Sequence, residues 1–336
     1  KDASQEYGMQ SEAIQLVGKT NAAASEKGMK FNTEYAKHLD KTSESYKMLD
    51  AQEMKDLTGI DYYINGLWTP GTAILQPALY IQSLADGVSK NSNVTIYENS
   101  PVISLEEEGR HDGQKIWKAK TNLGSISSPK IILAVNGIVE RFGYFQNRLM
   151  TIFTYSSLTR ELTTDESNTL GGSNEWGLTS ADAMGSSVRR ISGMGGNRIL
   201  VRNRWSYNPS MEASDSFMSS ASDSHNESFK ARFPMLDKVS MEYSWGGRLC
   251  LSINNVFAQG EVDDGIYSAC CQNGLGTAKG TAIGIITAEK ISGENTSLIP
   301  NFADEELPKK LMPKPLMWIS VNSYMRWKEL LAGKEK

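Results

Sequence analysis

The sequence predicts a mixed α/β (α+β) fold, in which a part that combines helices with parallel and antiparallel strands and a part built of long strands share one chain. Three observations support this prediction. A short apolar strand, a glycine-rich turn and a helix follow one another between Gly265 and Gly293. Helical and strand patterns alternate over residues 64–135, and longer strands with alternating apolar residues extend from Leu149 to about Trp245. With 336 residues, the chain is long enough for two domains with sizeable cores.

Residues 1–60 have a helical pattern. Apolar positions from Ala13 to Val17 predict a first helix, and Ser25 is suited to cap a second helix with a charged face. The residues from Asp50 to Glu53 have the form of a capping box, which predicts a short third helix that ends at Gly59.

The next region predicts a strand at 64–68, a turn at 69–72 and a helix with Pro77 in its first turn. Further elements are expected before residue 140: strands at 94–97 and 102–107, a hairpin over 115–125 and an apolar strand at 131–135.

The middle of the chain predicts long strands at 150–155, 187–192 and 198–204. The polar stretch from Pro209 to Ser224 predicts a loop, and a helix is expected from about Asn226 to Phe233, followed by a strand at 239–243.

Five arginines lie on two of these strands, which we expect to be neighbours: Arg189, Arg190, Arg198, Arg202 and Arg204. The two-residue period of a strand puts Arg198, Arg202 and Arg204 on one face. That face is either solvated or lines an anionic pocket.

The glycine-rich turn carries Gly274, Gly276 and Gly280, and a helix with apolar residues at three- and four-residue spacings follows from Thr277. A helix that begins in glycine presents unpaired N–H groups and a partial positive charge, which attract an anion or an electron-rich carbonyl. The spacing is not the GxGxxG fingerprint, and glycines at such a junction also serve packing alone.

The composition of the chain limits the kinds of partner that we expect. The net charge of −4 gives no basic field, and no apolar run approaches the roughly 20 residues of a membrane span, so we expect neither nucleic acid nor a membrane as a partner. Cys250, Cys270 and Cys271 are expected to be core thiols in a reducing cytoplasm. The three histidines lie far apart, so no metal site is expected.

The order of motifs carries a family resemblance. Gly265-Ile266-Tyr267, a short strand, Asn273-Gly-Leu-Gly276 and a helix ending Ala-Glu-Lys-Ile-Ser-Gly293 resemble the C-terminal flavin-binding segment of the FAD-dependent D-amino-acid oxidase-like oxidoreductases, especially the gamma-glutamylputrescine oxidase-like branch. The segment from Phe233 to Gly247 resembles the strand that returns the chain to the FAD domain in that family.

The resemblance implies an FAD/NAD(P)-binding three-layer domain, here incomplete, and an antiparallel-sheet substrate domain. The expected FAD-binding domain comprises 75–140 and 250–300, and the substrate domain 23–74 and 141–249. Residues 1–22 are expected to be a helical remnant of an N-terminal region, and 301–336 a C-terminal extension.

The resemblance also implies site residues. Flavin contacts are expected at five consecutive positions: Asn273, Gly274, Leu275, Gly276 and Thr277. Val102 resembles a position whose backbone meets the adenine, and Ala134 to Gly137 resembles the turn that packs against the dinucleotide. Arg190 and Tyr207 are the expected substrate contacts. Without the family, Val102 is simply a core valine.

No GxGxxG turn opens the sequence, which begins with a polar, helix-like stretch. We expect that an N-terminal portion, and an internal one near Lys19 to Ala24, of a longer protein is omitted. The alternative is a naturally shortened relative that does not hold FAD.

The sequence therefore predicts a cytoplasmic oxidoreductase with FAD as its cofactor and a small-molecule amine or amino acid as its substrate. In the family's chemistry a hydride passes to flavin N5, and the imine product hydrolyses. The competing hypothesis is a non-catalytic or truncated member that acts as a binding or scaffold protein. The sequence predicts no oligomeric state and no particular electron acceptor.

Overall fold

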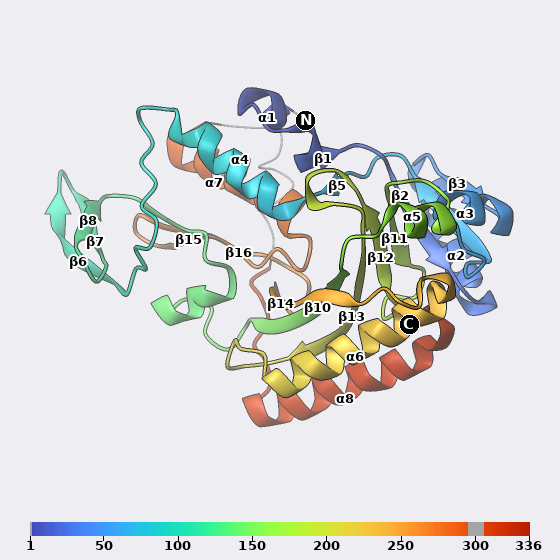
Figure 1. Cartoon of the computed structure of the whole chain (residues 1–336). Coiled ribbons are helices and arrows are strands. Elements are labelled where there is room, and N and C mark those ends of the chain that lie inside the picture. The colour runs from blue at the N-terminus through green and yellow to red at the C-terminus, as the bar shows by residue number, and fades with distance from the viewer. Residues whose placement is uncertain (1, 295–305) are drawn as a thin grey trace.

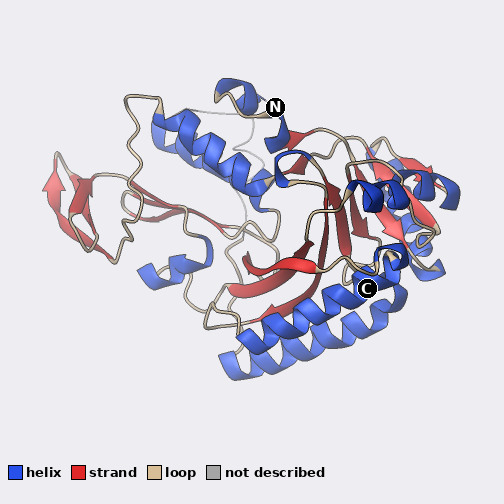
Figure 2. Cartoon of the chain, in the orientation of Figure 1, coloured by secondary structure: helices blue, strands red, loops and turns tan. Residues whose placement is uncertain are grey.

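The computed structural model of the chain describes residues 2–294 and 306–336. An eight-stranded sheet with helices packed on it forms the larger part (Figures 1 and 2). A smaller part combines a three-stranded sheet with helices α4 (Pro77–Ser89) and α7 (Gly276–Ser292). The predicted mixed α/β fold is confirmed.

The large sheet has the strand order β14-β10-β13-β12-β11-β2-β4-β3, and all of its pairs are antiparallel except β11 with β2. Its strands are β2 (Lys19–Ala23), β3 (Lys47–Leu49), β4 (Asn65–Thr69), β10 (Met150–Thr159), β11 (Trp176–Ser180), β12 (Ser187–Ile191), β13 (Arg198–Tyr207) and β14 (Met241–Leu251).

One face of this sheet is covered by α3 (Ala51–Thr58), α5 (Thr164–Leu170) and α6 (Asp215–Arg232). Alternate strand residues such as Val188, Ile199 and Val201 point to this face and pack with Phe229 and Phe233 in the main core. The opposite face carries Leu200 and the other residues of the alternate set, and it is called the open face below. Helix α2 (Glu26–Thr42) covers this face over β2 and β4, where Leu67 packs with Ala36 and Leu39.

The last helix, α8 (Lys314–Ala332), completes the sheet at a bare edge. Strand β12 pairs only with residues 198–202 of β13, so the backbone of 203–207 lacks a strand on that side. Asn322 of α8 accepts from the Tyr207 N–H at 2.9 Å and donates to the Tyr207 carbonyl at 3.0 Å, and Glu329 accepts from the Trp205 N–H at 3.0 Å. Side chains of a helix thus replace a missing neighbour strand.

The smaller part contains β15 (Ala258–Asp263), β16 (Ile266–Cys270) and β9 (Ile131–Leu133), with β16 parallel to β9. A separate antiparallel sheet of β6 (Ser104–His111), β7 (Gln114–Lys120) and β8 (Ser125–Ser128) projects from it, at the left of Figure 1. The remaining elements are α1 (Asp2–Glu6), β1 (Ile14–Gln15), α2 (Glu26–Thr42), β5 (Ile74–Leu75) and short 3-10 turns.

Most expected elements are present, including the Ser25 cap, which accepts from the Gly28 N–H, and the capping box at Asp50 and Glu53. Several expectations were wrong. Residues 14–23 form β1 and β2 rather than a helix, and 94–97 is not a strand. Helix α6 begins at Asp215, well inside the stretch expected to be a loop, because Ser214 caps it by accepting from the Phe217 N–H.

The three cysteines are buried and free, as expected of core thiols. Among the helices of residues 2–294 and 306–336, none has the length and apolar content needed to cross a membrane.

A buried polar network joins α6 to the sheet. Nδ1 of His225 forms a hydrogen bond with the Ser157 hydroxyl at 2.7 Å, and Nε2 lies 3.2 Å from the Asn203 carbonyl oxygen. Burial, with the nearby charges of Arg204 and Lys336, lowers the pKa of His225 from 6.5 to about 4.

We expect this histidine to make the fold acid-sensitive. Its pKa is depressed in the folded state, so the stabilisation is complete above pH 6.5 and is lost as the pH falls from 6.5 toward 4. Between pH 7 and pH 5 the loss amounts to about 2 kcal/mol in the free energy of unfolding. Urea unfolding at both pH values measures it. His225→Asn should flatten this dependence, whereas exposed His111→Gln should leave it unchanged; an unaltered dependence in His225→Asn contradicts the assignment.

Candidate functional site

The turn between β16 and α7 is held in an unusual backbone conformation. Cys271, Asn273 and Gly274 have φ values of 61°, 52° and 82°, in the left-handed region. The Asn273 side chain fixes the turn, because Oδ1 accepts from the Ser252 N–H at 2.9 Å and Nδ2 donates to the Val256 carbonyl at 3.0 Å. The chain after β14 therefore sets where α7 begins.

The first turn of α7 is open. Leu275 is its N-cap residue and provides no side-chain hydrogen bond, and residues 274–278 are exposed. Within the described residues, no acceptor pairs with the N–H groups of Gly276, Thr277 or Ala278. A Cβ added at Gly276 would meet nothing within 4 Å. Free N–H groups with space in front of them suit electron-rich oxygen atoms.

Two of the predicted cofactor segments lie together. Strands β9 and β16 are parallel, so their carboxyl ends lead side by side into 134–137 and 271–276. Asn136 joins them by accepting from the Cys271 N–H at 3.0 Å. Ala134 is exposed, whereas Gly137 is buried and a Cβ there would lie 3.3 Å from Met211 and 3.6 Å from Cys250.

Val102 stands outside this group. It precedes β6 and is 41% exposed, so it is not the core valine that the simpler interpretation expected. Among the described residues, no recorded contact joins Val102 to the turn at the start of α7.

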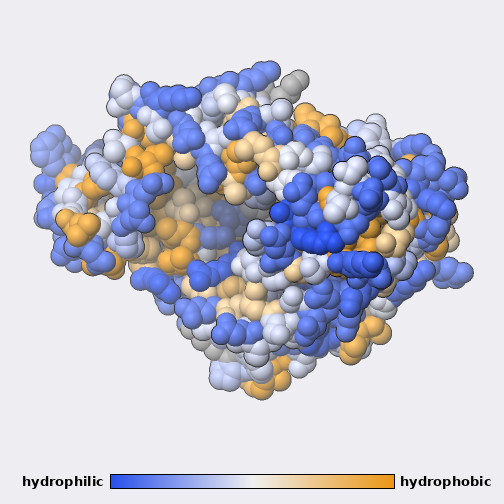
Figure 3. Space-filling view, viewed as in Figure 1, coloured by the Kyte–Doolittle hydropathy of each residue, from blue (hydrophilic) through white to orange (hydrophobic). Residues whose placement is uncertain are grey.

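The open face of the sheet meets the start of α7. A Cβ added at Gly274 would lie 3.9 Å from both Leu249 and Leu251 of β14. These leucines belong to an apolar cluster with Ile152 and Trp205. The space-filling view shows the molecule hollowed between the α4/α7 side and the large sheet (Figure 3).

Three basic side chains lie along the open face. In the strand register, Arg189 of β12 lies opposite Leu200 of β13 on one side and Gly177 of β11 on the other. Lys19 of β2 continues this line of residues across the sheet. Arg202 lies next to this row, where its Nη2 donates to the Ser187 hydroxyl at 3.2 Å and its guanidinium stacks over Trp205 at 5.7 Å.

These three cations are partly buried and lack acidic partners. Burial lowers the pKa of Lys19, Arg189 and Arg202, and the charge of Arg189 lowers the pKa of Arg202 further. No carboxylate of the described residues forms an ion pair with any of them. Buried charges without partners are costly, which makes this place favourable for an anionic group.

The predicted alignment of arginines is wrong at one position. A β-bulge opposite Thr154 and Tyr155, with Arg204 at φ 66°, shifts the alternation by one residue. Arg204 therefore points to the helix side, where it stacks on Phe217 at 5.5 Å and lies 3.7 Å from Glu329.

The two predicted substrate contacts are buried. Arg190 is 2% exposed, and its guanidinium donates to the Gly171 and Ser173 carbonyls and to Ser167 and Asn197. It points into the α5 side of the sheet, so its donors serve the scaffold. Its neighbour Arg189 is on the open face instead.

Tyr207 is 3% exposed and packs with Ile152 and Met317. Burial, together with the charge of Glu140, raises the pKa of its phenol. The substrate roles assigned to Arg190 and Tyr207 remain predictions without a free surface to support them.

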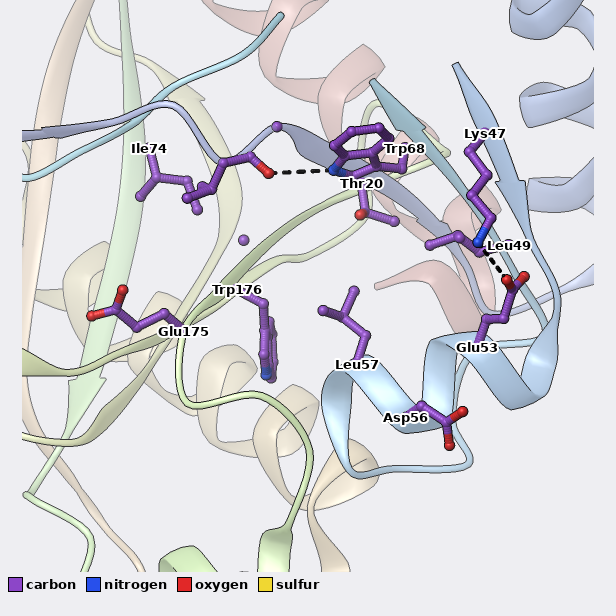
Figure 4. A pocket seen from close by; sticks show the side chains of 13 residues that line it. Thr20, Lys47, Leu49, Glu53, Asp56, Leu57, Trp68, Ile74, Glu175 and Trp176 are labelled. Carbon is purple, nitrogen blue, oxygen red and sulfur yellow. Dashed lines mark hydrogen bonds and ion pairs between the residues drawn. The ribbon is translucent and has the colours of Figure 1, made fainter. Parts of the chain in front are cut away.

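A separate cavity of about 380 Å³ lies between α3 and the starts of β2 and β11 (Figure 4). Trp68 and Trp176 line it, and Lys47 forms an ion pair with Glu53 at 2.6 Å on its rim. None of the predicted site residues reaches this cavity.

Sequence reasoning singled out Arg189 and Arg202 but missed Lys19, because it took β2 for a helix. Read as a strand, Lys19-Thr-Asn-Ala-Ala23 alternates and sends Lys19 to the face opposite Thr20 and Ala22. The support of Asn273 by Ser252 and Val256 carries no sequence signal, because it depends on where β14 ends.

Comparisons with known proteins agree with this architecture. A probable oxidoreductase, OrdL, of Haemophilus influenzae is 25% identical over 264 residues, which cover 76% of this chain and 56% of that protein, so the chain spans about half the length of this curated relative. The crystal structure of glycine oxidase from Geobacillus kaustophilus has a TM-score of 0.73 at 12% identity, covering 93% of this chain and 79% of that one.

The structure of L-amino acid deaminase from Proteus myxofaciens, in complex with anthranilate, has a TM-score of 0.68 at 14% identity and covers 90% of this chain and 78% of that one. Likeness at such identities shows the fold. A sequence model of the FAD-dependent oxidoreductase (DAO) family matches residues 1–290, most of the chain. The chain therefore belongs to the family of FAD-dependent oxidoreductases.

Proposed function

We propose that this chain is an FAD-dependent oxidoreductase that oxidises an amine or amino acid, and that the open face of the large sheet receives the substrate. The observation that carries the proposal is the row of Lys19, Arg189 and Arg202, three partly buried cations without acidic partners on the face that the start of α7 touches. The names of two structural neighbours, a glycine oxidase and an L-amino acid deaminase, support the substrate class.

The residues at the start of α7 fit the flavin. The unpaired N–H groups of Gly276 and Thr277 and the open space at Gly276 suit the oxygen atoms at the pyrimidine edge of its ring. We assign Asn273, Gly274 and Leu275 to the same contact. Ala134 and Gly137, at the neighbouring strand end, would hold the dinucleotide, and Val102 remains a weaker candidate.

The substrate end of the site is assigned to the cations. A substrate carboxylate would accept from Arg202 and Arg189, which are close enough for the charge of one to lower the pKa of the other. The apolar residues Leu249 and Trp205 would exclude water beside it. Fixed donors and a dry wall orient the carbon that bears the nitrogen.

FAD, when bound, supplies the acceptor for a hydride from that carbon. The chain's own residues bind and orient, and we assign none of them as general acid or base. The amine gives up its protons to water, so that it is neutral when the hydride leaves, and the resulting imine hydrolyses in water. The two electrons pass on to dioxygen or another acceptor, and the appearance of peroxide during turnover distinguishes an oxidase from a dehydrogenase.

The competing candidate is a family member that does not hold FAD and acts as a scaffold. A visible spectrum of the purified protein separates the two. Absorption bands of oxidised flavin that bleach anaerobically with an amine or amino acid support the enzyme. A colourless protein that takes up no added FAD overturns it.

Gly276→Leu should abolish flavin retention while the protein stays folded. The Leu side chain would enter open space, so it costs no packing, but it would block the N–H groups of α7. Flavin absorbance after gel filtration and the thermal midpoint are the two measurements. Gly284→Leu, which also faces open space two turns along the same helix, is the matched control and should retain flavin. Equal retention in both variants contradicts the assignment.

Arg202→Gln should raise KM for an amino acid by about tenfold or more, with little change for the amine that lacks the carboxylate. Loss of a charge-assisted hydrogen bond accounts for an effect of this size. Steady-state kinetics with both compounds measure it. Arg198→Gln, on the same strand but paired with Glu242, should change KM less than about threefold. Similar changes in KM for both substrates would contradict the proposal that Arg202 binds the substrate carboxylate.

A further inference from the structure

The outer side of α8 exposes a row of large apolar residues. Leu316, Ile319, Trp327 and Leu330 are between 54% and 79% exposed and recur at helical spacing. We call these four residues the α8 stripe. The inner side of the same helix is buried, since Met317 and Ala332 are 2% and 3% exposed. Figure 1 shows α8 at the outer edge of the molecule, beyond α6 and away from α7.

Two further large aromatic residues of α8 are exposed. Trp318 and Tyr324 are 50% and 57% exposed. Tryptophan and tyrosine have an apolar ring and a polar tip, a combination that suits the boundary between lipid headgroups and acyl chains. Apolar surface is visible at the lower rim of the molecule in Figure 3, where Figure 1 places α8.

The segment that contains the stripe has a basic surface. The exposed or partly exposed cations of this segment include Lys309, Lys310, Arg326, Lys328, Lys334 and Lys336. Its acidic residues Glu329 and Glu335 are 2% and 1% exposed, so among the described residues after 305 only Glu306 adds exposed negative charge. The protein as a whole has a net charge of −4, and this end of it has the opposite sign.

A basic pocket lies at the foot of the helix. Arg148, Lys310 and Leu311 line a cavity of about 590 Å³ just before α8 begins. Lys310 has no hydrogen-bond or ion-pair partner among the described residues. A cavity with a free ammonium group beside an exposed apolar helix offers a place for a phosphate of a lipid headgroup.

We propose that α8 docks the protein on an anionic lipid surface, with the α8 stripe in the interface and the surrounding cations on the headgroups. A helix with an apolar row, aromatic flanks and a basic rim binds such a surface in its plane. A second copy of the chain fits less well, because a two-fold contact between two such stripes would bring the basic rims of both copies together. The proposal replaces the expectation, drawn from net charge, that a membrane surface is not a partner.

Co-sedimentation of the full chain with vesicles tests the proposal. We expect binding to vesicles of three parts phosphatidylcholine and one part phosphatidylserine, at least tenfold weaker binding to phosphatidylcholine alone, and weakening with added salt. The double variant Trp327→Ser with Leu330→Ser should bind at least tenfold more weakly, since it removes exposed apolar area and, within the chain, the surface ring contacts of Trp327 with Tyr324 and Lys328. Leu123→Ser, a 96% exposed leucine in the projecting sheet, is the matched control and should bind as the unchanged protein does.

A separate variant tests how much the cations contribute to vesicle binding. This test is needed because α6, beside α8, carries the exposed acids Asp223 and Glu227, which oppose that contribution. Lys310→Glu with Lys328→Glu should weaken binding to anionic vesicles at least tenfold and leave the thermal midpoint unchanged. Three results would overturn the proposal: no sedimentation with anionic vesicles, equal sedimentation of the stripe variant, or a concentration-dependent dimer that the stripe variant dissolves.

Discussion

The structure depends on the side chain of Asn273. By bonding to Ser252 and Val256, it ties the turn before α7 to the chain that leaves β14, the outermost strand of the large sheet. Apolar contacts such as those beside Leu249 and Leu251 are not directional, whereas these hydrogen bonds are. The turn residues adopt left-handed conformations, and the tie places the start of α7 beside Leu249 and Leu251 of the open face. The geometry of the proposed site follows from this one connection.

Much of the fold could be predicted from local signals, and the misses have a common physical cause. Caps at Ser25 and Asp50 and the glycine stop at Gly293 are local, so the sequence predicts them well. The bulge at Arg204 depends on α6 and α8 closing over it, and the edge of β13 depends on Asn322, more than 100 residues away. Tertiary contacts of this kind leave no periodic pattern in the sequence.

The same division applies to the proposed site. The position of the glycine turn could be predicted, because strand, turn and helix follow one another in the chain, whereas the 134–137 segment is indicated by the family resemblance alone. Of the cationic row, the sequence singled out Arg189 and Arg202 but not Lys19, because the row assembles from β2, β12 and β13 through pairing register. Arg190 shows how far sequence alone can assign such side chains. It follows Arg189 in the sequence but points to the other face of the sheet. A shift of one residue in the strand register would exchange the two.

The fold separates charges in a way that the net charge of the chain does not reveal. Acidic residues outnumber basic ones overall, yet burial of Glu329 and Glu335 leaves the cations of the last segment dominant on its surface. Glu329 and Asn322 hold α8 to the backbone of β13, so the helix cannot leave the sheet without exposing unpaired N–H and C=O groups. Its outer side is therefore presented by a fixed helix, and docking through it would require no rearrangement of the sheet or of the cations on the open face.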